Sequence, residues 1–348
     1  MVKALRARLL VLWRRSPGVC IAMAVLASSL LSLSPYFVSS TEVVRMRNAL
    51  LFTVKQRADF EWTPASMPSD FKAEQGPPDP MFADLVRRLR LESMPTDFER
   101  AVAISVHLLG SSPKLVGGGI QSGLHETYDA ITREGRGYCA DFVRVFMAMA
   151  TAAGIPVRSW AFSFDDFGGE GHILPEIWNR QLGRWQLIGI FFNFIFIGPD
   201  GEPMSGLEFR DALYTGNGLP TLVPLHPGAR PGFIFEDKAF AYYVRGAAEW
   251  YMWWGNNTFS FERSWSVRLL RPLGRGAEQI GAVLQGVHPA VAILANDRNV
   301  DQIKGLQRVR VHLGVVTLAW AASLIYLLAR HLLRRRQRRV PSLVEANW

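Results

Sequence analysis

The stretch GRGYCADFVRVFMAMATAA, residues 135–153, decides the fold. Two glycines precede Cys139, and the run after it repeats apolar side chains at helical spacing. We therefore expect a helix over residues 140–153 with a broad buried face and with Cys139 at its start. Unpaired amides at a helix N-terminus carry partial positive charge, which favours a thiolate, and the glycines let a substrate backbone approach closely.

The periodicity changes after Gly154-Ile155-Pro156. Residues 157–164, 172–178 and 185–197 are rich in aromatic and β-branched side chains and are separated by Gly, Asp and Asn, which predicts three strands. One helix followed by several strands indicates an α+β fold rather than alternating βαβ units.

A histidine opens the second of these predicted strands. On a strand, His172, Leu174 and Glu176 point to one face, which would aim the imidazole at the Cys139 thiol. Taken alone, a single cysteine is more often a small buried hydrophobe, and a single histidine is more often a hydrogen-bonded structural residue. Neither residue establishes catalysis by itself.

Together, residues 132–193 resemble the transglutaminase-like superfamily, which has a papain-like fold in which the Cys helix packs on an antiparallel sheet. The segments GYCADF (137–142), GIPVR (154–158), HILPEI (172–177) and WQLI (185–188) carry the resemblance, with Leu174 where Trp is common. The resemblance implies acyl transfer, in which Cys139 attacks an amide or ester carbonyl. His172 would take the thiol proton and return it to the leaving group.

The sequence departs from the family pattern four residues after Trp185. The family usually has Asp there, and this chain has Gly189. That Asp fixes the tautomer of the imidazole and stabilises its charged form. Asn193 is our candidate replacement, although it lies four residues too far along the chain. A catalytically dead descendant is the alternative.

Other polar residues near the motifs have weaker claims. Asp165, Asp166 and Glu176 are further candidates to orient the imidazole, but we expect Glu176 to form a buried ion pair with Arg158 on the adjacent strand. Gln121, in a glycine-rich loop, is a candidate oxyanion donor.

Two uncharged runs indicate membrane segments. Residues 16–41 contain no charged side chain, and residues 311–329 form a second such run. About 20 apolar residues span a bilayer. A cleaved signal peptide is the alternative for the first run, and a buried core helix is the alternative for the second.

The net charge of +9 comes from the two ends of the chain: residues 1–15 and 330–348 are strongly basic, and the body between them is nearly neutral. Basic flanks stay in the cytoplasm. Both termini are therefore expected in the cytoplasm of a bacterium, with the main domain in the periplasm and inner-membrane lipid as a partner. A neutral body argues against nucleic acid as a partner.

We expect six parts along the chain. They are a basic cytoplasmic tail at 1–15, a membrane helix at 16–41, a transglutaminase-like periplasmic domain with an N-terminal helical part at 42–230, an aromatic-rich and helical extension at 231–310, a membrane helix at 311–329 and a basic cytoplasmic tail at 330–348.

Metal and cofactor sites are not predicted, because no His/Cys cluster has zinc spacing and no phosphate-binding loop is present. The aromatic residues of 250–265 favour core packing or a membrane-interface belt over a sugar-stacking platform. Residues 193–213 resemble, more loosely, a bacterial subgroup associated with extracellular polysaccharide production. The predicted function is thiol-dependent amide hydrolysis or acyl transfer on an envelope protein or peptide. The alternative is a catalytically impaired scaffold or binding component of a polysaccharide assembly system.

Overall fold

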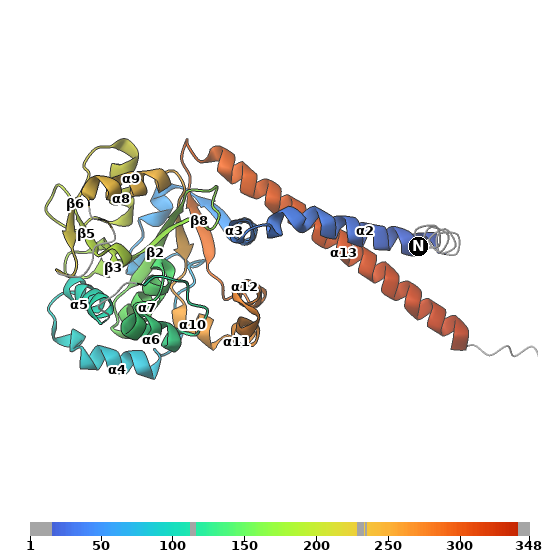
Figure 1. The fold of residues 1–348 in the computed structure, drawn as a ribbon, viewed down its shortest axis with the longest axis horizontal. Helices are drawn as coiled ribbons and strands as arrows, with labels where there is room; N and C mark the ends of the chain where they lie inside the picture. Colours follow the sequence, from blue (N-terminus) through green and yellow to red (C-terminus); the bar gives the residue numbers. More distant parts are fainter. Residues whose placement is uncertain (1–15, 112–115, 228–232, 234, 340–348) are drawn as a thin grey trace, which may run out of the picture. The chain divides into compact units, whose positions relative to one another are not determined.

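A computed structural model describes residues 16–111, 116–227, 233 and 235–339 of the chain (Figure 1). It divides into two compact units, one of residues 50–303 and one that joins residues up to 49 with residues from 304 onward. The predicted tail at residues 1–15, and the C-terminal tail from residue 340, lie outside the described residues.

The larger unit is built on one eight-stranded sheet in the order β1-β8-β7-β2-β3-β4-β5-β6. Its strands are β1 (Phe52–Lys55), β2 (Val157–Ser163), β3 (Gly171–Asn179), β4 (Arg184–Gly189), β5 (Phe194–Ile197), β6 (Thr221–Pro224), β7 (Trp250–Trp254) and β8 (Ala290–Leu294). Adjacent strands of the sheet are antiparallel, except for β1 and β8, which are parallel. Together with the helices below, this confirms the α+β class.

The helices of this unit are α4 (Pro80–Arg88), α5 (Asp97–Gly110), α6 (Leu124–Glu134), α7 (Cys139–Ala152), α8 (Gly206–Thr215), α9 (Glu236–Gly246), α10 (Thr258–Arg263), α11 (Trp265–Leu270) and α12 (Arg275–Leu284). The predicted Cys-bearing helix is α7. Thr96 caps α5 by accepting a hydrogen bond from the Glu99 amide.

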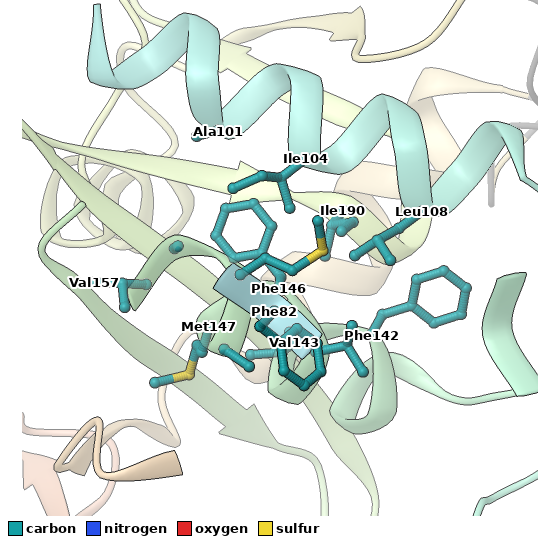
Figure 2. Close-up of a cluster of buried hydrophobic side chains, with 14 of the residues drawn as sticks. Phe82, Ala101, Ile104, Leu108, Phe142, Val143, Phe146, Met147, Val157 and Ile190 are labelled. Carbon is teal, nitrogen blue, oxygen red and sulfur yellow. The ribbon is translucent and has the colours of Figure 1, made fainter. Parts of the chain in front are cut away.

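Two hydrophobic clusters cover the two faces of the sheet. The first cluster contains side chains of α4, α5, α6 and α7 together with Val157, Ile177 and Ile188 of the sheet. Figure 2 shows side chains of α4, α5 and α7 packed near Val157 of β2 and Ile190. The other joins Trp160, Phe162 and Leu174 to α8 and α9. The Cys-bearing helix and the α8–α9 pair therefore lie on opposite faces of the sheet (Figure 1).

Two predicted segments differ from the structure. The strand predicted over 185–197 is broken into β4 and β5 by the short helix η5 (Ile190–Phe192), after which Asn193 has a φ of 62°. The segment 231–310, expected to be an aromatic-rich and helical extension, also supplies β7 and β8 to the same sheet as β2 and β3. Short apolar runs such as Ala290–Leu294 do not by themselves distinguish a strand from a buried helix.

The smaller unit holds two helices long and apolar enough to cross a membrane, at Pro17–Phe37 and Val300–Arg336. They belong to α2 (Pro17–Leu33) and α13 (Val300–Arg339), and α3 (Ser40–Leu51) follows the first. His312 of α13 hydrogen-bonds Ser32 at 3.0 Å and Tyr36 at 2.9 Å. A side chain at Gly18 would collide with Tyr326, so a small residue of the first helix, rather than Gly314 of the second, permits the close approach.

Candidate active site

The N-terminus of α7 is fixed by Asp141. Its carboxylate accepts hydrogen bonds from the amides of Tyr138 at 2.9 Å and Ile120 at 3.4 Å, which ties the helix start to the glycine-rich loop. Gly137 has a φ of +121°, and an added Cβ would crowd Asp141 and Phe142 at 3.3–3.4 Å. Glycine at this position allows the turn that places Cys139 at the first position of the helix.

The Cys139 thiol is half-buried and protonated at neutral pH. Burial raises its pKa above the ordinary value of 9.0, while the backbone amides of Ile173 and Ala140 act in the opposite direction. The helix N-terminus was expected to favour the thiolate. In the folded chain the loss of solvation outweighs it.

His172 is 4% exposed and lies in β3, opposite Phe162 of β2. Phe192 stacks on the imidazole with ring centroids 4.6 Å apart, and Tyr242 and Tyr243 of α9 lie at 6.0 and 6.2 Å. Burial among these rings lowers the His172 pKa from 6.5 to about 3. The imidazole is therefore neutral, and its buried Nε2 has no hydrogen-bond partner within the described residues.

His172 contacts Phe162 of β2 and the tyrosines of α9 on the face of the sheet that α8 and α9 cover, whereas Cys139 begins α7 on the opposite face. The prediction that the face of His172, Leu174 and Glu176 aims the imidazole at the thiol is therefore not confirmed.

The sheet has a gap beside His172. Pairing between β3 and β4 begins at Glu176, so in the described part of the chain no strand pairs with the β4-side edge of residues 171–175. Phe191 fills the region from η5, with its ring 5.6 Å from Phe142 of α7 and 6.1 Å from His172.

Cys139 and His172 also share the tyrosine pair. A charge on Cys139 would raise the pKa of both Tyr242 and Tyr243, the same residues whose rings contact His172. No hydrogen bond joins the thiol to the imidazole among the residues that the structure describes.

Gly189 occupies the position where an orienting Asp was expected, and the space beside it is filled. A Cβ there would lie 2.9 Å from the Phe194 carbonyl oxygen and 3.0 Å from the Phe196 ring. The side-chain amide of Asn193 binds both backbone polar groups of His226, at 2.8 and 3.0 Å. These two hydrogen bonds of Asn193 fix the loop at His226.

The remaining candidates hold the fold together. Arg158 Nε donates to Glu176 Oε2 at 2.5 Å, with both side chains buried, so the expected ion pair between adjacent strands is present. Glu176 also accepts from the Trp160 indole and the Gly206 amide. The Arg158 guanidinium lies 3.9 Å from the Trp185 ring centroid.

The other polar candidates have partners away from the imidazole. Asp165 accepts from the backbone amides of Gly168 and Glu170, and the Gln121 amide donates to Glu278 at 3.1 Å.

Two features of the site are not evident from the motifs. Tyr242 and Tyr243 come from α9, about seventy residues beyond His172, and only the aromatic density of that region signals them. Glu249 is buried and accepts hydrogen bonds from Ser163 and from the Phe167 amide at 2.9 Å, which fixes the turn before His172. Among the described residues, no group of three or more His, Cys, Asp or Glu is arranged to hold a metal ion.

Comparisons with known proteins identify one family domain in the chain. A solved structure from Parabacteroides distasonis ATCC 8503, described as a "putative protease", aligns with 54% of this chain and 30% of its own length, at 15% identity and a TM-score of 0.26. No curated protein matches the chain. Residues 84–189, which include Cys139 and His172, match the family model of the transglutaminase-like superfamily. The chain therefore contains a transglutaminase-like superfamily domain.

Proposed function

We propose that the chain is a membrane-anchored thiol enzyme that hydrolyses or transfers an acyl group at an amide of an envelope protein or peptide. Cys139 is the nucleophile and His172 is its general base. The observation that carries this proposal is the position of Cys139. Cys139 is the first residue of α7. The backbone amide of Ile173, the residue after His172, acts on the Cys139 sulfur and lowers its pKa.

The pair starts the reaction uncharged. Burial lowers the pKa of His172 to about 3 and raises that of Cys139 above 9.0, so the neutral pair is favoured over a thiolate–imidazolium pair before attack. The thiol proton therefore passes to His172 as the sulfur–carbon bond forms. His172 then gives the proton to the departing amine as the carbon–nitrogen bond breaks, and water or another amine takes the acyl group from sulfur.

The membrane topology is part of the proposal. The helices at Pro17–Phe37 and Val300–Arg336 cross the inner membrane, and the basic residues beyond them keep both termini in the cytoplasm. Residues 50–303 then face the periplasm, where an envelope protein or peptide is within reach.

A catalytically impaired scaffold or binding component of a polysaccharide assembly system is the second candidate. One observation favours it: Phe196 and the Phe194 carbonyl fill the space beside Gly189 where the family's Asp would be. Without an orienting group His172 is neutral and enclosed, which suits a core that has ceased to catalyse and retains a binding role.

Acylation of Cys139 by an activated ester distinguishes the two. The full chain carrying Cys20→Ser, in detergent at pH 7, is treated with p-nitrophenyl acetate and mapped by mass spectrometry. An enzyme acetylates Cys139 faster than the same thiol reacts in urea-unfolded protein, and the thioester then turns over. Acetylation no faster than in the unfolded chain contradicts the enzyme and favours the scaffold. The Cys139→Ala variant is the control for other sites.

A further inference from the structure

The short helices α11 and α12 are joined by η6 (Arg271–Leu273). Together they carry large apolar side chains that are exposed to solvent. Exposure is 67% for Trp265, 64% for Leu269, 75% for Leu273, 59% for Ile280 and 80% for Leu284. Trp265 and Leu269 are four residues apart, as are Ile280 and Leu284, so each helix has its own exposed apolar row. Single exposed hydrophobic residues are ordinary, but five within twenty residues mark an interaction surface.

The inner sides of the two helices pack against each other. Ser266 Oγ donates to the Gly281 carbonyl oxygen at 2.8 Å, and a Cβ at Gly281 would lie 2.8 Å from the Ser266 carbonyl oxygen. Val267 and Ala282 are completely buried. The exposed rows are therefore a second face of an already packed helix pair, not a loose core.

The exposed charges of the pair itself, within residues 264–286, have one sign. Between residues 264 and 286 the sequence has three arginines and a single acid, Glu278. Glu278 is buried and accepts a hydrogen bond from Arg271 at 2.7 Å. Arg268 and Arg275 are exposed, so the open surface of the pair combines apolar and basic side chains with no exposed carboxylate. This is the composition of helices that lie in the interface of an anionic bilayer.

We infer that the α11–α12 pair docks on the surface of a bilayer that contains anionic phospholipid, with its apolar rows in the acyl boundary and Arg268 among the headgroups. Tryptophan is enriched at this depth of a membrane. The unit of residues 50–303 continues at both ends into helices long and apolar enough to cross a membrane, and the inference rests on the proposed anchoring by these helices. The inference does not depend on the chemistry of Cys139.

Docking would bring lipid close to the loop that precedes the candidate nucleophile. Arg275 donates to the Ile120 carbonyl oxygen at 3.3 Å and lies 3.6 Å from Asp141, which fixes the start of α7. The membrane-facing pair and the N-terminus of the Cys-bearing helix are thus in direct contact.

Lipid contact is tested on the full chain in nanodiscs that hold one copy each. On a Cys20→Ser, Cys139→Ser background, Leu269→Cys and Leu284→Cys are labelled with a nitrobenzoxadiazole dye, and quenching by doxyl-labelled phosphatidylcholine is measured. Leu182→Cys, at another exposed leucine, is the matched control (50% exposed). Thermal melting of each variant confirms that it is folded.

In discs of mixed phosphatidylcholine and phosphatidylglycerol we expect quenching at 269 and 284 to exceed that at 182 several-fold. Arg268→Glu, or discs without phosphatidylglycerol, should reduce it. Quenching at 269 and 284 no greater than at 182 overturns the inference. A second set of discs holds two copies each. Dye emission that shifts to the blue only in this set, without quenching by lipid, also overturns the inference, because a second copy would then cover the face.

Discussion

Acid should destabilise the protein through His172. The folded pKa of about 3 lies below the ordinary value of 6.5, so the unfolded chain takes up the proton first. The stability contributed by a neutral buried imidazole is complete above pH 6.5 and is lost as the pH falls towards 3. From these two pKa values the loss is about 2 kcal/mol at pH 5, about 3 kcal/mol at pH 4 and about 5 kcal/mol once both states are protonated.

His172→Leu is the matched variant, because leucine fills a similar volume among Phe162, Phe192 and Tyr242 without a titratable group. Urea unfolding of the full chain in detergent, followed by tryptophan fluorescence between pH 7 and 4, gives both free energies. Carboxylates also weaken the fold in acid. Burial raises the pKa of Asp97, but its Arg180 partner lowers it by more, so Asp97 stabilises the fold only while it is charged. This contribution is the same in variant and parent and cancels when their unfolding free energies are subtracted. The difference in unfolding free energy between variant and parent should shift by about 3 kcal/mol in favour of leucine from pH 7 to pH 4. Parallel curves would show that His172 is not neutral and enclosed.

Three further perturbations address the thiol, the buried ion pair and the missing carboxylate. Alkylation of Cys139 by iodoacetamide should rise about tenfold per pH unit from pH 6 to 9, because burial raises the pKa of the thiol; a plateau across this range would instead indicate a preformed ion pair. Arg158→Met or Glu176→Leu alone should each lower the unfolding free energy by about 3–5 kcal/mol, and the double variant should lose less than the sum in urea titrations; strict additivity would contradict coupling. Gly189→Asp alone should destabilise the fold without speeding Cys139 acylation, because the space beside residue 189 is filled. In the double variant Gly189→Asp, Phe196→Ala, acylation of Cys139 measured by mass spectrometry should be faster than in Phe196→Ala alone. Equal rates would show that a carboxylate at residue 189 does not reach His172.

Local patterns in the sequence predict the elements that carry the site. The apolar spacing after Cys139 predicts α7, and the β-branched and aromatic runs predict β2 and β3 nearly residue for residue. The ion pair of Arg158 and Glu176 follows from placing the two residues on adjacent strands.

Long-range packing is what the sequence does not reveal. The break at η5 depends on the left-handed conformation of Asn193, which is tied to the loop at His226. The enclosure of His172 depends on Tyr242 and Tyr243 of a helix that no spacing rule links to it. The thiol pKa is raised because burial competes with the helix N-terminus, and burial is a property of the folded chain.

The rate of Cys139 acylation in His172→Ala tests the proposed pair most directly. At pH 7, removal of the imidazole should slow acetylation by p-nitrophenyl acetate about 10²-fold or more, the usual contribution of a general base. Alkylation by iodoacetamide above the thiol pKa should be unchanged, because the thiolate then forms without help. Equal acetylation rates in the parent and in His172→Ala would mean that the imidazole does not act on the sulfur.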